Sequence, residues 1–169
     1  MSDDAVLGLA NTGDAYAIAA MSRDLIETGL GWEYRRERVA RMIADPDLIA
    51  LVARQTPRLA GFALMSVTDE RAHIALLAVR PAHQRLGVAR RMLAWLTASA
   101  QAAGVATMHV ELRAGNEPAY ALYRACGFEE TLRIPGYYLG REAAVRMLLV
   151  LRPLHAAMPA WEPPARDIQ

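Results

Sequence analysis

The sequence changes from a strand-like to a helix-like pattern across one short connection, and this change limits the fold more than any other feature. The apolar run HIALLAV occupies residues 73–79. From Gly87 to Ala103, apolar residues recur at the three- and four-residue spacing of a helix. The connection RPAHQRL contains a proline and several polar or basic residues. A strand must therefore lead through a turn into the N-terminus of a helix.

The segments around this unit indicate a mixed α/β fold. Apolar runs at 48–54 and 59–67 are joined to it and to each other by short links, which are typical of antiparallel hairpins. We expect a short strand at 7–10, a helix over 14–27 capped from Asn11, Thr12 or Asp14, and a second helix ended by Pro46. After Gly104 we expect a strand at 105–112, a helix at 117–126, and the strands FEETLRI and AAVRMLLVL around a turn IPGYYLGRE. This order predicts a mixed sheet with helices on both faces.

Composition favours one soluble globular domain. The chain has 169 residues, 54% hydrophobic and 22% charged, and we expect a domain over 1–152 followed by a Pro-rich tail over 153–169. The formal net charge of +1 gives no indication of nucleic acid or an anionic membrane as a partner. The acidic N-terminus and the lack of a long apolar run lead us to expect a cytoplasmic protein. A monomer and a homodimer both remain open.

Neither metal nor disulfide chemistry is expected. Cys126 is the only cysteine, which excludes an intramolecular disulfide. The four histidines are scattered and give no metal-ligand spacing. Cys126 ends an apolar helix without a partner histidine, so inert packing is favoured over a role as an acyl-carrying nucleophile.

The start of the helix at Gly87 is a candidate anion site. The first N–H groups of a helix have no carbonyl partners and carry the positive end of the helix dipole, so a phosphate can bind there. Gly87 and Ala89 would let a pyrophosphate approach the backbone, while Gln84, Arg85 and Arg90 could add donors. A single glycine at such a turn is more often only part of the turn. The GxxxxGK[ST] and GxGxxG phosphate motifs are absent.

The segment that follows carries a specific resemblance. It reads VELRAGNEPAYALYRACGF, with the spacing E-x-R-x-x-N-x-x-A-x-x-L-Y-x-x-x-G-F formed by Glu111, Arg113, Asn116, Ala119, Leu122, Tyr123, Gly127 and Phe128. Together with LLAVRPAHQRLGVARRML, where Gln84, Gly87 and Ala89 match a Q/R-x-x-G-x-G/A signature, it resembles the GCN5-related N-acetyltransferase (GNAT) superfamily. Within that superfamily it is most similar to the branch containing ribosomal-protein alanine N-acetyltransferases.

This resemblance implies a fold and a cosubstrate. The GNAT fold has a central, mostly antiparallel sheet of about seven strands with a splay between strands 4 and 5. Acetyl-CoA would bind at the splay, and an amine would attack its thioester directly in a ternary complex. The coenzyme contacts implied by the resemblance are Leu77, Ala78, Val79, Gln84, Arg85, Leu86, Gly87, Val88, Ala89, Arg90, Asn116 and Tyr123. Asn116 is also a sufficient helix cap on its own.

Two residues are expected to act in catalysis. By resemblance, Glu111 is the general base, through a water molecule, and Tyr123 is the general acid for the leaving thiolate. Taken alone, Glu111 is more simply a solvent-facing charge on an edge strand, and Tyr123 a core aromatic. One carboxylate suits an α-amine, with a reference pKa of about 7.7–8.0, better than a lysine amine near 10.4.

Several aromatic residues are candidates for the site that binds the acceptor amine. Trp32, Tyr34, Tyr137 and Tyr138 are candidates, with Glu111, for its binding wall, and core packing is an equal alternative for the four aromatic residues. We expect an N-acetyltransferase acting on a protein or peptide N-terminal amine. The alternatives are a small-molecule amine acetyltransferase and a non-catalytic acyl-CoA-binding module.

Overall fold

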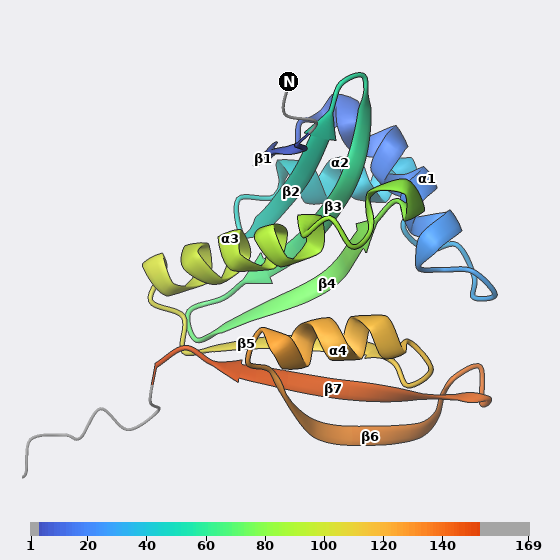
Figure 1. Ribbon diagram of the computed structural model, residues 1–169, viewed down its shortest axis with the longest axis vertical. Coiled ribbons are helices and arrows are strands. Elements are labelled where there is room, and N and C mark those ends of the chain that lie inside the picture. The colour runs from blue at the N-terminus through green and yellow to red at the C-terminus, as the bar shows by residue number, and fades with distance from the viewer. Residues whose placement is uncertain (1–3, 153–169) are drawn as a thin grey trace, which may run out of the picture.

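The computed structural model describes residues 4–152, which form one seven-stranded sheet with helices on both faces (Figure 1). In chain order, the elements are β1 (Val6–Leu9), the 3-10 turn η1 (Thr12–Asp14), α1 (Ala15–Leu25), α2 (Arg36–Ala44), β2 (Leu48–Gln55), β3 (Arg58–Val67), β4 (Arg71–Val79), the 3-10 turn η2 (Pro81–His83), α3 (Val88–Ala102), β5 (Thr107–Arg113), α4 (Glu117–Ala125), β6 (Glu129–Tyr138) and β7 (Glu142–Val150). The expected order of strands and helices is confirmed.

The sheet divides into two parts that separate along part of their common border. Its strand order is β1-β2-β3-β4-β5-β7-β6, and every neighbouring pair is antiparallel except β4 and β5, which run parallel. The parallel pairing covers only residues 71–74 of β4 and 107–110 of β5. Beyond these four pairs the two strands diverge. The predicted GNAT fold, with a splay between strands 4 and 5, is confirmed.

A β-bulge marks the place where β4 leaves β5. Met65 of β3 pairs with Ile74, but Leu64 pairs with Leu76, so Ala75 has no partner in the β3 register. A bulge adds one residue to a strand and bends it. The bend occurs directly after Ile74, the last residue of β4 that pairs with β5.

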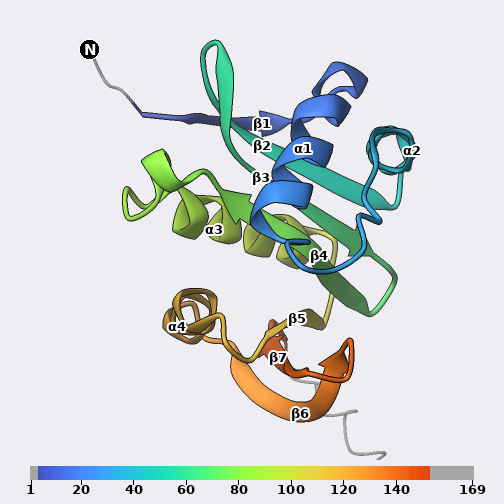
Figure 2. The same cartoon turned by 90° about the vertical axis from the view of Figure 1, so that its right-hand side faces the viewer.

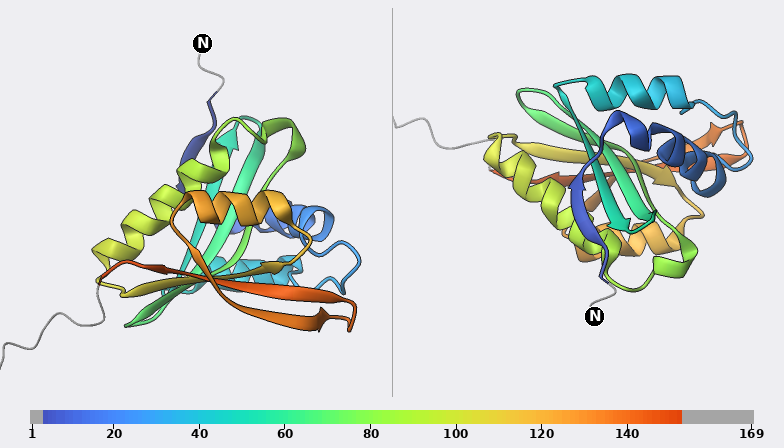
Figure 3. Two further views of the ribbon diagram at one scale, coloured as in Figure 1. Left: turned by 60° about the horizontal axis from the view of Figure 1, so that its bottom comes forward. Right: turned by 90° about the horizontal axis from the view of Figure 1, so that it is seen from above.

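The helices form two layers with the sheet between them (Figures 2 and 3). Helices α1 and α2 pack on β2–β4 in one core, which contains Ile18, Met21, Val39, Phe62 and Leu64. Helices α3 and α4 pack on the opposite face in a second core. This second core joins both parts of the sheet, because it includes residues of β3, β4, β5 and β7.

The chain enters α1 through a well-capped turn. The Asn11 side chain accepts the Gly13 N–H, and the Asp14 carboxylate accepts the Asn11 N–H at 2.8 Å, which forms a capping box. Arg54 of β2 donates two hydrogen bonds to the same carboxylate, at 2.9 and 2.6 Å, and these lower the pKa of Asp14. The predicted cap from Asn11 is therefore confirmed for the 3-10 turn that leads into α1, whereas Asp14, the N-cap of α1 itself, makes no side-chain cap bond and instead ties the turn to the sheet through Arg54.

The turn predicted over IPGYYLGRE is too long. Strand β6 continues to Tyr138, and only residues 139–141 connect it to β7. The pairing register shifts between Ile134 and Tyr138, where Gly136 adopts a φ of +65°. An irregularity of this kind allows the strand to continue past a proline and a glycine that are usually read as a turn. The helix expected over 14–27 ends at Leu25, and the Pro-rich tail lies outside the described residues.

Candidate active site

An open cleft of about 1220 Å³ lies at the splay between β4 and β5. One part is formed by the turn before α3, and another by β5, the end of α1, Tyr138 and Glu142. Helix α4 contributes further lining residues, including Tyr123. The cleft therefore brings segments from most of the domain to one place.

The turn before α3 has a backbone suited to an anion. Arg85 and Gly87 both adopt left-handed conformations, with φ of +62° and +78°, and Gly87 is the N-cap of α3. The Arg91 N–H donates to the Gly87 carbonyl at 3.0 Å. The N–H groups of the first helical turn, Val88 to Arg90, have no carbonyl one turn earlier within the helix. This is the local geometry of a phosphate-binding helix start.

Among the side chains of this turn, Gln84 stabilises the turn, and several, including Gln84, line the cleft. Gln84 donates its amide N–H to the Val79 carbonyl at 2.9 Å, which closes the turn onto the end of β4. Gln84, Arg85, Gly87, Val88, Ala89 and Arg90 all line the cleft. Leu86 is exposed and is not among the lining residues.

Strand β4 offers main-chain groups to the cleft. Leu77, Ala78 and Val79 line it and pair with β3 on their other side. Because β5 has diverged by this point, the main-chain groups of β4 that would have faced β5 have no strand partner. These groups lie where the resemblance expects the pantetheine arm and the oxyanion.

Glu111 lies in the cleft and not on an edge strand, because β5 has neighbours on both sides. Its cross-strand partner in β7 is Arg146, whose Nε lies 2.7 Å from Glu111 Oε2. The Glu111 side chain is 20% exposed. Contact with this carboxylate raises the pKa of the Tyr137 phenol. The carboxylate is thus accessible and held in one orientation.

Tyr123 reaches the same cleft from α4. The residue is 4% exposed, and its ring meets Phe128 edge-on with centroids 5.2 Å apart. Burial raises the pKa of the phenol well above its usual value. The phenol is therefore neutral at neutral pH, and burial makes it a weaker acid than an exposed tyrosine. Asn116, at the start of α4, accepts the Ala119 N–H at 3.2 Å, so its cap role is confirmed, and it also lines the cleft.

The aromatic candidates for the acceptor wall separate into two groups. Tyr138 lines the cleft, and burial raises its pKa to about 12. Tyr137 stacks edge-on against it but does not line the cleft. Trp32 and Tyr34 pack against the core under α1 and α2, and neither lines the cleft. Arg23 and Arg35 stack on Trp32, and Arg38 stacks on Tyr34.

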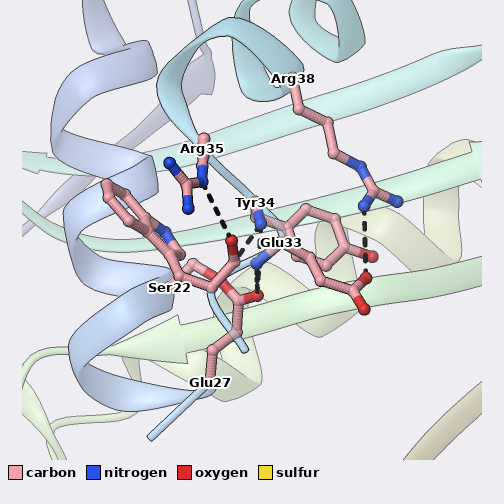
Figure 4. A network of polar contacts seen from close by, with 7 residues as sticks. Ser22, Glu27, Glu33, Tyr34, Arg35 and Arg38 are labelled. Carbon is pink, nitrogen blue, oxygen red and sulfur yellow. Dashed lines mark hydrogen bonds and ion pairs between the residues drawn. The ribbon is translucent and has the colours of Figure 1, made fainter. Parts of the chain in front are cut away.

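Three residues of the site region were not predicted from the sequence. Arg146 pairs with Glu111, and its only sequence signal is a charge within an apolar strand. Arg113 donates to the carbonyls of Thr28 and Ile26, at 2.8 and 3.4 Å, and approaches Glu142 at 3.7 Å. Glu27 is buried, and its contacts with the segment before α2 are shown in Figure 4. Because these contacts join residues that are distant in sequence or depend on the path of a loop, sequence patterns do not predict them.

Other chemistries find little support in this region. Cys126 packs partly buried against the second core, and burial raises the pKa of its thiol, which disfavours a thiolate nucleophile. In residues 4–152, no group of three or more His, Cys, Asp or Glu side chains is placed to hold a metal ion. No helix in that range is long and apolar enough to cross a membrane.

Comparisons with known proteins agree with this geometry. Residues 18–128 match the model of the Acetyltransferase (GNAT) family. The [Ribosomal protein bS18]-alanine N-acetyltransferase of Escherichia coli K12 is 39% identical over 98 residues, which cover 56% of this chain and 66% of that protein. The chain thus spans slightly less than two thirds of this relative's length in the match.

Solved structures share the architecture over nearly the whole domain. The ribosomal-protein-S18-alanine N-acetyltransferase from Escherichia coli has 28% identity and a TM-score of 0.76, over 90% of this chain and 97% of that chain. The yncA protein from Salmonella typhimurium, solved with its cofactor acetyl-CoA, has 24% identity and a TM-score of 0.75, over 92% and 98%. With the splayed sheet, the helix-start turn and the family match together, the chain belongs to the GNAT acetyltransferase family.

Proposed function

We propose that this protein transfers an acetyl group from acetyl-CoA to the α-amine of a protein or peptide N-terminus. The observation that carries the proposal is that one cleft joins the helix-start turn at Gly87 with Glu111 and Tyr123. The turn suits a pyrophosphate, and the two side chains suit the two proton transfers of amide formation. Family membership supports acetyl-CoA as the cosubstrate.

In the proposed reaction, the chain positions two substrates and moves two protons. Main-chain N–H groups of residues 85–90 hold the pyrophosphate, and unpaired groups of β4 orient the arm and stabilise the oxyanion. Glu111 accepts a proton from the amine through water. The neutral amine nitrogen then forms a bond to the thioester carbon, the carbon–sulfur bond breaks, and Tyr123 donates its proton to the sulfur. The second proton of the amine nitrogen leaves as the amide forms and, through water, restores the Tyr123 phenol.

The acceptor is proposed from chemistry and from the relatives. A single carboxylate suits an α-amine, whose reference pKa is near 8, better than a lysine amine near 10.4. The relative from Escherichia coli K12 is named for acetylation of an alanine of a ribosomal protein. An N-terminal alanine is therefore the first acceptor to test. A ribosomal-protein acceptor would place the reaction in the cytoplasm.

The proposal is tested by measuring thiol release and product mass with acetyl-CoA and matched acceptors. A peptide with a free N-terminal alanine should be acetylated once. The same peptide with a blocked N-terminus and an internal lysine should not react. Turnover of polyamines or amino acids alone would favour a small-molecule acetyltransferase. Binding of acetyl-CoA without turnover of any amine would favour a non-catalytic module.

A further inference from the structure

The segment between α1 and α2 is held by a buried carboxylate that the proposed reaction does not use. Glu27 is 8% exposed, and its Oε1 accepts the N–H groups of Glu33 at 2.6 Å and Tyr34 at 3.2 Å. Its Oε2 accepts the hydroxyl of Ser22, a fully buried residue of α1, at 2.9 Å. Figure 4 shows the carboxylate between the helix and the returning segment. Glu27 thus fixes both ends of residues 28–32.

The same segment forms a wall of the cleft. Ile26, Thr28 and Leu30 line it, as do Glu111 and Arg113 of β5. Arg113 donates to the Thr28 carbonyl at 2.8 Å, which links the segment to β5 across the splay. The partners of Glu27 are all in α1 or in this segment, and none belongs to the turn before α3.

We propose that Glu27 is a positioning residue that holds residues 28–32 as the acceptor-side wall of the cleft and thereby sets the affinity for the acceptor amine. This inference rests on the proposed function. A buried amide N–H that loses its acceptor is costly, so without the carboxylate the segment would adopt other conformations. The acetyl-CoA site would be left unchanged.

Two substitutions of similar size test this role. Glu27→Met keeps the buried volume but has no oxygen to accept the two N–H groups. Glu27→Gln retains an amide oxygen for the loop and an NH2 group for Ser22, so it should restore the contacts. We expect Glu27→Met to raise the KM for an alanine-starting peptide about tenfold, which corresponds to the loss of one to two net hydrogen bonds. The KM for acetyl-CoA should not change, and Glu27→Gln should remain close to the unsubstituted protein.

Glu33→Met is the matched control. Like Glu27→Met, it replaces a glutamate of this segment with methionine and removes one negative charge. The Glu33 side chain, however, is 71% exposed, and only the backbone N–H of Glu33 binds Glu27. We expect it to leave the acceptor KM unchanged. If Glu27→Met does not fold, Arg113→Lys replaces it, because lysine keeps the charge but lacks the guanidinium Nη2 that donates to the carbonyls of both Thr28 and Ile26. That variant should also raise the acceptor KM selectively.

Hydrogen exchange at the amides of Glu33 and Tyr34 gives a readout independent of activity. In Glu27→Met these amides should exchange faster, and in Glu27→Gln they should remain protected. Unchanged protection in Glu27→Met would overturn the inference, as would lost protection with an unchanged acceptor KM. If the unsubstituted protein acetylates no peptide, the proposed function fails, whereas the exchange result still reports on the loop.

Discussion

Glu111 and Tyr123 occupy different environments although they line the same cleft. Glu111 is accessible and paired with Arg146 across β5 and β7. Tyr123 is buried and packed against Phe128. A base that must exchange protons with water needs access, while a proton donor to a sulfur needs to remain protonated. The access of Glu111 therefore fits its proposed role, whereas burial keeps Tyr123 protonated but weakens it as an acid, so its proposed role rests on its place in the cleft.

Replacing Glu111 with glutamine should lower kcat for peptide acetylation by about 10²–10³, because a positioned general base typically contributes 10²–10⁴. The amide retains the shape of the side chain, so the dissociation constant of acetyl-CoA should stay the same. Steady-state kinetics and calorimetric titration measure the two quantities. An unchanged kcat would remove Glu111 from the proton transfer.

Replacing Tyr123 with phenylalanine should also lower kcat, by about 10², and should leave the pH dependence below pH 10 unchanged. Burial raises the pKa of this phenol above its usual value near 10, so the neutral form persists as the pH rises through 10. Ionisation of Tyr123 therefore cannot cause a fall in rate between pH 7 and 10. A fall in that interval that vanishes in Tyr123→Phe would contradict this assignment.

The sequence predicts that these two residues share a site, because the motif spacing from Glu111 to Phe128 is local, and both line the cleft. The sequence does not predict Arg146, since the pairing of β5 with β7 brings together residues far apart in the chain. It also could not separate Tyr138, which lines the cleft, from Trp32 and Tyr34, which do not. An aromatic side chain can line a cleft or pack in a core, and the path of the backbone around it decides which, whether in a loop, as for Trp32 and Tyr34, or at the end of β6, as for Tyr138.

At the scale of elements, the unit of β4, its following turn and α3 sets the site. Gly87 ends the turn in a left-handed conformation, and a Cβ added there would have no atom within 4 Å. The restriction at this position is therefore the backbone conformation and not local crowding. A side chain would also stand in the space that the coenzyme is proposed to fill.

Gly87→Val should raise the dissociation constant of acetyl-CoA at least tenfold, because a β-branched residue strains a positive φ by about 1–2 kcal/mol and displaces the turn. Leu86→Val, at the exposed neighbouring residue, is the control and should bind acetyl-CoA normally. Isothermal titration of both variants provides the comparison. Normal binding by Gly87→Val would exclude this turn as the coenzyme site.

The elements themselves were largely predictable, and the exceptions have local causes. The predicted cap at Asn116 starts α4, and the predicted cap at Asn11 starts the 3-10 turn that leads into α1. The extent of β6 was misread because Pro135 and Gly136 are strong turn signals, yet an edge strand can accept both through a bulge. The bend at Ala75, which opens the cleft, has no sequence signal of its own and follows from the pairing register.

At the scale of the whole molecule, the two parts of the sheet are joined by few backbone pairs but by a continuous core. Only four residue pairs connect β4 with β5. The core under α3 and α4 spans both parts and includes Met65, Ile74, Met108 and Met147. Packing and not the sheet ladder therefore holds the splay at its width, and the two parts should unfold together.

The substitution Met108→Ala tests whether the two parts of the sheet unfold together. Met108 lies in β5 and is fully buried, so its truncation should cost about 2–5 kcal/mol. For a domain of this size, each kcal/mol lowers Tm by roughly 2–4 °C. Calorimetry should show one transition at lower temperature. Two separate transitions would show that the parts fold independently.

The way in which the segment from Thr28 to Trp32 is attached bears on which of its residues can be changed to alter acceptor preference. Its two ends are fastened by main-chain contacts to Glu27 and Arg113, which do not depend on the side chains in between. The side chains of Thr28 and Leu30, which line the cleft, can therefore be exchanged without rebuilding this frame, whereas Gly29, with a φ of +77°, and Trp32, which packs against the core, belong to the frame itself. If the segment forms the acceptor wall as proposed, selectivity for a new amine can be engineered at these two positions.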